Sequence, residues 1–203
     1  EGLPVADIDE IRLVANGSAI QRLKGNQLVK YLQFDGLEDP TAGLFTLWMD
    51  RYGLMTRKGK QFTALGTQHM VTDANPVPMK NLYFEVDIRA GATNPVLKID
   101  AITNPATAPV GVVKLIRQFN HSWTGSGEYD VADLPMGNKI NRIFLFKTGG
   151  TGNITNVKVE REQYTLFDRT PAKNDLVQTQ GARIPQADVF VIDPTELGYG
   201  DDG

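Results

Sequence analysis

The chain has 203 residues, of which 41% are hydrophobic and 22% are charged, and this composition excludes an intrinsically disordered protein. It contains no cysteine, which excludes disulfide bonds, thiolate metal sites and a cysteine nucleophile. A formal net charge of -3 argues against a protein that wraps nucleic acid, because such proteins need clustered Lys and Arg. No apolar run approaches the roughly 18 to 20 residues of a membrane-spanning helix.

Short apolar or alternating runs separated by glycine and proline extend along the whole chain, a pattern typical of many short strands joined by turns. The first two runs, 10–15 and 18–23, flank Asn16-Gly17. Both of these residues tolerate a positive φ, so the sequence predicts a tight type I′ hairpin. Further strands are expected at 45–50, 82–89, 96–103, 140–147, 156–161 and 187–193.

The run at 82–89 alternates most clearly between apolar and charged residues, and the run at 96–103 follows the same pattern. In a half-buried strand, the apolar side chains face a core and the others face water. We therefore expect Leu82, Phe84, Val86, Ile88, Leu97, Ile99 and Ala101 to point inward, and Glu85, Asp87 and Arg89 to point outward.

Helical signals are few and short. Asn26 is placed to cap a turn or two that reaches Leu32, and Pro171 is suited to the first position of another helix that reaches Val177. Strands follow one another in sequence without crossover helices. The expected fold is therefore all-β, a sandwich or jelly roll with two short helices.

Part of the pattern occurs twice. Ile8, Ile11, Leu13 and Ile20 match Ile154, Val157, Val159 and Leu166 at an offset of 146 residues. An insertion of two residues then aligns 26–29 with 174–177, so that each copy consists of a strand, a turn, a strand and a helix that starts at the shared Asn-x-Leu-Val.

Apolar alternation can match itself by chance in any β-protein, but spacing that survives over this length favours a duplication. A period near 146 residues in a chain of 203 leaves the second copy incomplete, so we expect the molecule to continue past Gly203.

Residues 8–22 and 127–146 resemble a known family. They are similar to the major capsid proteins of tailless icosahedral double-stranded DNA phages with an internal membrane, the corticovirus type. In that family, a segment like Asp133-Leu134-Pro135 opens a jelly roll. The second copy has this segment and the first copy lacks it.

The resemblance implies a double jelly roll, with two β-sandwiches side by side in one subunit. It also implies trimers that tile an icosahedral shell as pseudo-hexagonal capsomers. We expect the boundary near the interruption at 104–109. This gives a first roll at 1–109 without its N-terminal strands and a second at 110–203 without its C-terminal strands.

Candidates for catalytic or metal chemistry are weak. His69 and His121 are flanked by polar residues and lie at no metal-ligand spacing, so they are interpreted as surface or turn histidines. The Gly-rich stretch 149–152 lacks the Lys and Ser or Thr of a phosphate loop and is interpreted as a hairpin tip. No catalytic, cofactor-binding or metal residue is assigned.

Charged groups have ordinary interpretations as well. The carboxylate pairs Asp9–Glu10 and Glu160–Glu162 are interpreted as solvated faces rather than glycosidase pairs. A Ca²⁺ site would need oxygen ligands gathered from the C-terminal acidic residues, and no EF-hand spacing supports one. The calcium candidates are Asp193, Glu196, Asp201 and Asp202.

A basic stretch contains Arg51, Arg57, Lys58 and Lys60. We interpret it as a solvated loop, and the alternative is a surface that binds phosphate or lipid headgroups.

The leading hypothesis is a non-enzymatic viral capsid subunit, a homotrimer in the virion that contacts other virion proteins and the internal membrane lipid. It binds no specific nucleic-acid sequence and is made in the bacterial cytoplasm. The alternative is a carbohydrate- or receptor-binding β-sandwich module. Trp48 and Trp123 are the aromatic candidates for sugar contacts, but they are interpreted as core or interface anchors. A β-sandwich glycosidase ranks last.

Overall fold

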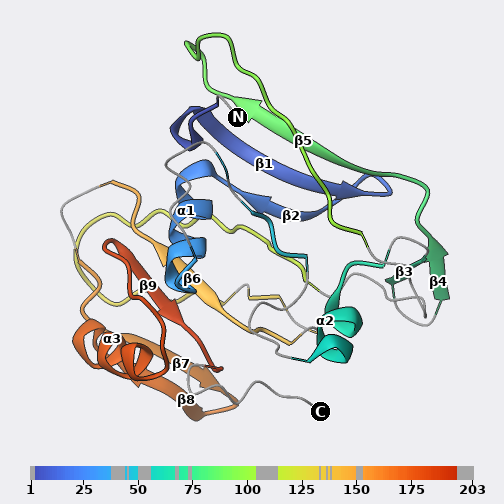
Figure 1. Cartoon of the computed structure of the whole chain (residues 1–203). Helices are drawn as coiled ribbons and strands as arrows, with labels where there is room; N and C mark the ends of the chain where they lie inside the picture. The colour runs from blue at the N-terminus through green and yellow to red at the C-terminus, as the bar shows by residue number, and fades with distance from the viewer. Residues whose placement is uncertain are drawn as a thin grey trace. The chain divides into compact units, whose positions relative to one another are not determined.

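The computed structural model describes residues 3–37, 44, 46–49, 56–66, 69–72, 75–103, 114–132, 134, 135, 137, 139–149 and 153–195. β-Strands predominate in this part of the chain and the helices are short, so the all-β class expected from the sequence is confirmed (Figure 1). None of the described helices is long and apolar enough to cross a membrane. The strands are β1 (Ile8–Ala15), β2 (Ser18–Leu23), β3 (His69–Thr72), β4 (Asn75–Pro78), β5 (Leu82–Ile88), β6 (Ile143–Phe146), β7 (Val157–Arg161), β8 (Tyr164–Arg169) and β9 (Val189–Ile192), and the α-helices are α1 (Gly25–Phe34), α2 (Arg57–Thr63) and α3 (Pro171–Gln180).

The chain divides into two compact units. The first unit comprises Glu1–Val29 and Asp39–Asn120, and the second comprises Lys30–Glu38 and His121–Gly203. The division falls within α1, so this helix contributes residues to both units.

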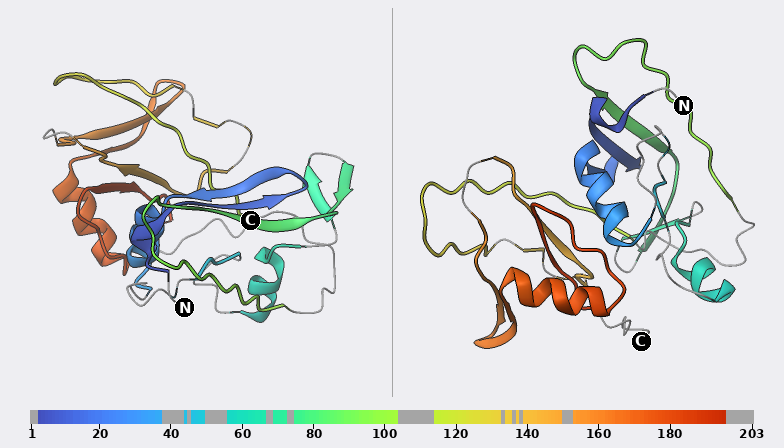
Figure 2. Two further views of the ribbon diagram at one scale, coloured as in Figure 1. Left: turned by 90° about the horizontal axis from the view of Figure 1, so that it is seen from above. Right: turned by 60° about the vertical axis from the view of Figure 1, so that its left-hand side comes forward.

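The first unit is built on an antiparallel sheet of three strands in the order β2-β1-β5, which can be followed in Figure 2. Asn16 and Gly17 join β1 to β2 with φ values of 49° and 78°. These two positive φ values are those of a type I′ turn, so the expected hairpin is confirmed. The Asn16 side chain also accepts a hydrogen bond of 2.7 Å from the backbone N–H of Lys80, which ties the turn to the start of β5.

The core of the first unit lies on one face of this sheet. Leu13, Ala15 and Ile20 are buried together, and Phe84 of β5 packs against them. Phe84 thus points inward as expected, whereas Leu82 and Ile88 at the two ends of β5 stay exposed. The predicted apolar face of β5 is therefore buried at its centre only.

α1 begins directly after β2. The side chain of Gln27 accepts a hydrogen bond of 3.0 Å from the N–H of Lys24, as in one half of a capping box. The first residue of the helix is Gly25. A larger residue does not fit at this position, because a Cβ there would lie 2.4 Å from the carbonyl oxygen of Val5. Asn26, expected as the cap, is instead the second helical residue.

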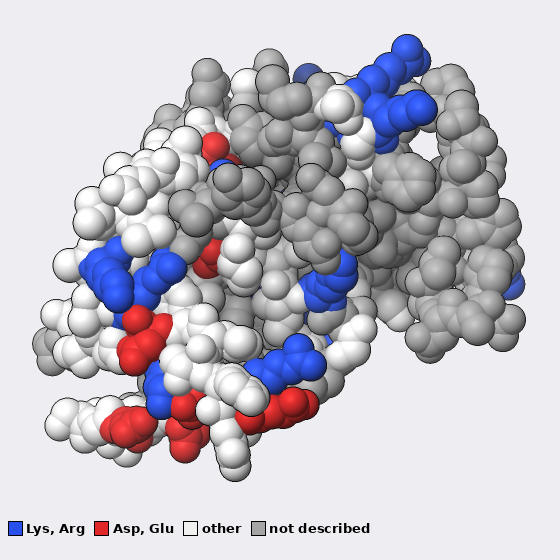
Figure 3. Space-filling model, turned by 90° about the horizontal axis from the view of Figure 1, so that it is seen from below, with Lys and Arg blue, Asp and Glu red and all other residues white. Residues whose placement is uncertain are grey.

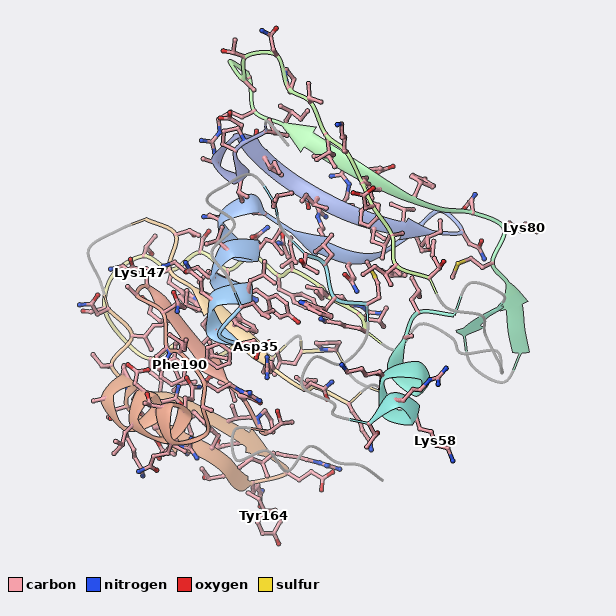
Figure 4. All side chains as sticks on the ribbon, in the orientation of Figure 1. Asp35, Lys58, Lys80, Lys147, Tyr164 and Phe190 are labelled. Carbon is pink, nitrogen blue, oxygen red and sulfur yellow. The ribbon has the colours of Figure 1, made fainter. Side chains whose placement is uncertain are left out.

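α2 is one helix more than the two expected, and it corrects the interpretation of the basic stretch as a loop. Thr56 caps it by accepting a hydrogen bond of 3.1 Å from the N–H of Gly59. The sequence signal missed here was a threonine N-cap. Arg57, Lys58 and Lys60 lie exposed on this short helix, and Lys58 points away from it in Figure 4, while Arg51 lies outside the described residues.

The second unit contains two pairs of antiparallel strands, β6 with β9 and β7 with β8, together with α3. Phe167 of β8 contacts Phe190 of β9 edge to face, with 6.1 Å between ring centroids. Asn174 and Gln178 of α3 both donate hydrogen bonds to the carbonyl oxygen of Val191 in β9, at 2.9 and 2.5 Å. β9 therefore contacts α3 through hydrogen bonds and β8 through Phe167.

Two predicted strands are wrong within the described residues. Residues 96–103 form no strand, and Leu97, Ile99 and Ala101 are exposed instead of inward. Residues 46–49 likewise lie outside any strand, whereas Phe45 and Asp50 are outside the described residues. Alternation makes a segment suitable for a sheet, but a strand also needs a neighbour with which to form hydrogen bonds.

The hairpin of β3 and β4 escaped prediction, since Pro76 and Pro78 weaken the strand signal in the sequence. His69, interpreted from the sequence as a surface or turn histidine, is the first residue of β3 and does not lie in a turn.

Candidate assembly surface

The residues considered for catalysis are distributed among separate ion pairs. Asp9 accepts a hydrogen bond of 3.2 Å from Arg89, and Glu160 forms an ion pair with Lys158. No group of three or more His, Asp or Glu side chains that could hold a metal ion occurs among the described residues. Of the calcium candidates, Asp193 is described and Glu196, Asp201 and Asp202 are not.

Most of the glycine-rich stretch interpreted as a hairpin tip cannot be compared with the structure. The described strands on either side of it pair elsewhere, β6 with β9 and β7 with β8. Gly149 has a φ of 87°, and residues 150–152 lie outside the described part of the chain.

The outer face of the first unit's sheet carries a network of charges centred on Arg12. Its guanidinium donates hydrogen bonds to Glu85 and Asp87 of β5 and to Glu10 of β1, at 2.8 to 3.1 Å. Hydrogen bonds to Asp87 and then to Glu85 raise the pKa of Arg12 further above its already high value. Side chains from two adjacent strands are thereby held in one register.

Glu10 joins the third strand to this network. Arg22 of β2 donates to both of its carboxylate oxygens, and the distance from Nη2 to Oε2 is 3.0 Å. The hydrogen bond from Arg22 is the main reason that the pKa of Glu10 is lowered. Glu10 therefore remains ionised at pH values where an ordinary glutamate starts to bind a proton.

The same hairpin-and-helix arrangement occurs twice along the chain, at a constant offset of 146 residues. β2 and α1 correspond to β8 and α3 from their first to their last residues. The two hairpins have the same register, since Ile11 pairs with Leu23 as Val157 pairs with Arg169. A register shift follows Leu13 in the first hairpin and Val159 at the equivalent place in the second.

The turns of the two units are also equivalent. Glu162 and Gln163 have φ values of 49° and 70°, close to those of Asn16 and Gly17. Each helix ends in one hydrogen-bond pattern, in which Leu37 donates to Leu32 in the first copy and Arg183 donates to Gln178 in the second. A duplication in the sequence is the simplest origin of this agreement.

The constant offset corrects the predicted alignment of the two helices, because no insertion precedes α3. Leu28 and Leu32 correspond to Asn174 and Gln178, and all four side chains are buried. Leu176, which the sequence had matched with Leu28, is exposed. The second copy thus replaces two buried leucines by amides that bond to β9.

Four charged side chains form a largely buried cluster in the second unit. Arg142 contacts Asp35 at 2.7 Å and Asp193 at 2.9 Å, and Arg183 contacts Asp193 at 3.2 Å. The side chain of Asp193 is fully buried and also accepts hydrogen bonds from the N–H and the hydroxyl of Thr195. Figure 4 shows Asp35 at the end of α1.

The surroundings of this cluster are aromatic. Arg142 lies over the Phe34 ring, 5.4 Å from its centroid, and Tyr31 and Phe34 both contact Phe144. Burial by itself would lower the pKa of Arg142, but the Asp35 and Asp193 carboxylates outweigh it and raise the value. Burial, with a further contribution from Asp35, raises the pKa of Tyr31 to about 12. Arg142 therefore stays charged. The Asp193 carboxylate is occupied by ion pairs with Arg142 and Arg183 and is not a free Ca²⁺ ligand.

Two apolar side chains of the second hairpin remain exposed. Tyr164 and Leu166 of β8 are 75% and 64% exposed, and Tyr164 projects away from the hairpin in Figure 4. The equivalent of Leu166 in the first unit, Ile20, is buried in the core. The charged side chains do not form a patch of one sign along one edge of the face drawn in Figure 3, because basic and acidic side chains adjoin one another there.

Comparisons with known proteins agree with this arrangement of two similar halves. The family model described as the viral coat protein P2 N-terminal domain matches residues 1–104, and the model of the P2 C-terminal domain matches residues 113–203. The chain belongs to the viral coat protein P2 family. It is therefore a viral coat protein located in the virion capsid, as the leading hypothesis from the sequence expected.

A solved structure extends the comparison to the fold. The crystal structure of the major capsid protein P2 from bacteriophage PM2 is similar, with a TM-score of 0.64 and 15% sequence identity. The alignment covers 98% of this chain and 71% of that chain. No curated protein matches the chain in sequence. The predicted resemblance to corticovirus-type capsid proteins is confirmed.

Removing one carboxylate of the buried cluster should destabilise the second unit strongly. Asp193→Ala leaves Arg142 and Arg183 short of a buried counter-charge, and we expect a loss of about 3 to 5 kcal/mol in the free energy of unfolding. Asp175→Ala, at an exposed position of α3, is the control and should change it by less than about 0.5 kcal/mol. Urea unfolding followed by circular dichroism measures both, and equal effects would contradict the role of the cluster.

The lowered pKa of Glu10 predicts an acid-sensitive first unit. The stabilisation is complete above pH 4.5, the ordinary value for the carboxyl group, and is lost as the pH falls through the lower folded-state pKa. Thermal unfolding between pH 6 and pH 2 should therefore show a smaller loss of stability in Glu10→Gln than in the unchanged protein. Glu162→Gln, at an exposed turn, should follow the unchanged protein, and an unaltered pH profile of Glu10→Gln would refute the prediction.

Proposed function

We propose that this coat protein is a major capsid subunit that assembles as a homotrimer with a pseudo-hexagonal outline. Each half of the chain would be one jelly roll, divided near residue 109, with the first roll at 1–109 and the second at 110–203. The observation that supports this proposal best is the hairpin-and-helix unit that recurs at an offset of 146 residues.

The physical reason for a trimer is that three chains, each with two similar halves, approximate six-fold symmetry. A trimer of chains with two similar halves offers six comparable edges, so a nearly hexagonal tile can be made from three copies. Contacts between such tiles can each be modest, because many act together in a closed shell. The loops at the ends of the strands can then vary while the sheets remain rigid.

The proposal includes the other partners and the place of synthesis. The subunit would contact other virion proteins and internal membrane lipid, and it would be made in the cytoplasm of a bacterial host. A sequence-specific nucleic-acid contact is not expected from a chain of net charge -3. Enzyme activity is not part of the proposal, since Asp9, Glu10 and Glu160, three of the carboxylates considered for catalysis, take part in ion pairs.

A second candidate function is supported by one loop of the second unit. The rings of Trp123 and Tyr129 are stacked with 5.3 Å between centroids, and both are about half exposed. The Tyr129 hydroxyl donates to the carbonyl oxygens at Thr124 and Gly125, which holds the loop closed. Preorganised aromatic rings suit the apolar faces of sugars, so this loop is a candidate receptor contact.

Light scattering after size exclusion tests the capsid proposal. We expect a mass of three times 22.4 kDa that persists on dilution. A monomer at all concentrations would refute the trimer.

The receptor candidate makes a separate prediction for Trp123→Ala. Substitution at an exposed loop should leave the mass by light scattering unchanged. If the loop binds sugar, galactose- or glucose-based oligosaccharides at about millimolar concentration should shift the Tyr129 and Trp123 NMR signals of the unchanged protein. The Trp123→Ala variant should show no such shift of Tyr129. The absence of any shift in the unchanged protein would refute the receptor candidate and leave the capsid proposal intact.

A further inference from the structure

Three basic side chains lie close together on α2 and take no part in the ion-pair networks of the protein. Arg57, Lys58 and Lys60 fall within about one helical turn, and all three are exposed. In the described part of the chain none of them has an ionic partner. The whole chain has a net charge of -3, so this group of positive charges is opposite in sign to the protein that carries it.

The helix that carries these charges is joined to the core of the first unit. Thr56 caps its N-terminus, and Leu65, two residues after its end, packs against the core cluster of this unit. Figure 4 shows Lys58 pointing away from the helix. The positive charges are therefore presented outward on a support that is anchored by apolar packing.

The exposure of these side chains indicates which kind of anion they suit. A site for a single phosphate group needs donors that converge on it and are held in place by their surroundings. Exposed Lys and Arg side chains that do not converge act instead by their summed charge, and each adds to the attraction of a surface with many negative charges. The group on α2 therefore suits an extended anionic surface better than one enclosed phosphate.

Among extended anionic surfaces, a lipid bilayer fits the group best. Acidic side chains of a second copy are less suitable, because many of those described already have an arginine partner. Duplex nucleic acid is usually bound through a longer stripe or patch of basic residues, which three positions on a short helix do not supply. A bilayer with anionic lipid presents a plane of phosphate headgroups, to which a few basic residues at one place are enough to add affinity.

We propose that α2 binds anionic lipid headgroups at a membrane surface through Arg57, Lys58 and Lys60. This contact rests on the proposed meeting of the subunit with internal membrane lipid, and it assigns that meeting to one helix. Each basic residue near an anionic membrane raises the affinity about fivefold, so the three together raise it about a hundredfold. In a trimer, three such helices act together and strengthen the binding further.

Co-sedimentation with vesicles tests the contact. The protein is mixed with vesicles of phosphatidylcholine that contain about one-third phosphatidylglycerol, and separately with vesicles of phosphatidylcholine alone. We expect binding to the anionic vesicles only, and this binding should weaken as salt is added. The triple variant Arg57→Gln, Lys58→Gln and Lys60→Gln should bind the anionic vesicles about a hundredfold more weakly, and Lys58→Gln alone about fivefold more weakly.

The matched control removes the same number of positive charges from the same unit. Lys24→Gln, Lys80→Gln and Lys98→Gln replace three exposed lysines that lie on separate segments of the first unit. Both triple variants have the same net charge, and circular dichroism checks that both are folded. The control should lose no more than about threefold in affinity, because charges outside the patch are screened by salt. Equal losses in the two triple variants would show an effect of net charge alone and would overturn the proposal.

Other anions separate the bilayer from a discrete phosphate site and from nucleic acid. Inorganic phosphate should displace the protein from anionic vesicles no better than sodium chloride of equal ionic strength. Specific displacement by phosphate would show a site for a single phosphate group and would refute the bilayer as the ligand. Duplex DNA that binds through the same three residues as tightly as the anionic vesicles would refute it as well.

Failure of this contact can be told apart from failure of the proposed function. If the α2 triple variant binds anionic vesicles as tightly as the unchanged protein, lipid is contacted elsewhere, and the assignment to α2 is overturned while the lipid contact stands. If the unchanged protein binds neither kind of vesicle, the assignment and the lipid contact are both refuted. The mass by light scattering then still decides the trimer.

Discussion

The structure depends on one constraint, which is that the apolar face of a two-stranded hairpin must be buried against another element. Two antiparallel strands alone are marginally stable in water, so each hairpin must add a strand or pack an element against its apolar face. In the first unit, β5 completes the sheet and Phe84 closes the core over Leu13 and Ile20. In the second unit, the equivalent hairpin contacts β9 through Phe167 and Phe190, and the bulged residue Leu166 remains exposed.

Polar side chains, more than apolar ones, determine how α3 and the segments around β9 pack in the second unit. Leu28 and Leu32 of α1 correspond to Asn174 and Gln178 of α3, which bond to the carbonyl oxygen of Val191. The ion pairs of Arg142 and Arg183 with Asp35 and Asp193 join three parts of the chain that are distant in sequence, around residues 35, 142 and 183–193. Such buried charges add little net stability compared with apolar packing, but they disfavour any arrangement in which one of them loses its partner.

These features agree with a coat protein. The charges of the first unit's sheet form ion pairs that hold strands in register. Two halves with the same hairpin register and the same helix ends provide similar blocks from one chain. The differences between them lie in what packs against each hairpin.

The sequence by itself determined the hairpin at Asn16-Gly17, both longer helices, the strands with clear alternation and the duplication, because these depend on local periodicity and on residues that tolerate positive φ. It also carried the family resemblance. The tertiary structure decided which alternating segments become strands: 82–88 pairs with β1, whereas 96–103 has the same pattern and pairs with none of the described residues. It also decided the correct alignment of α1 with α3 and the meeting of Asp35, Arg142, Arg183 and Asp193. Hydrogen bonds between strands and contacts between distant charges depend on what lies beside each segment in space, and neither is encoded in the spacing along one chain.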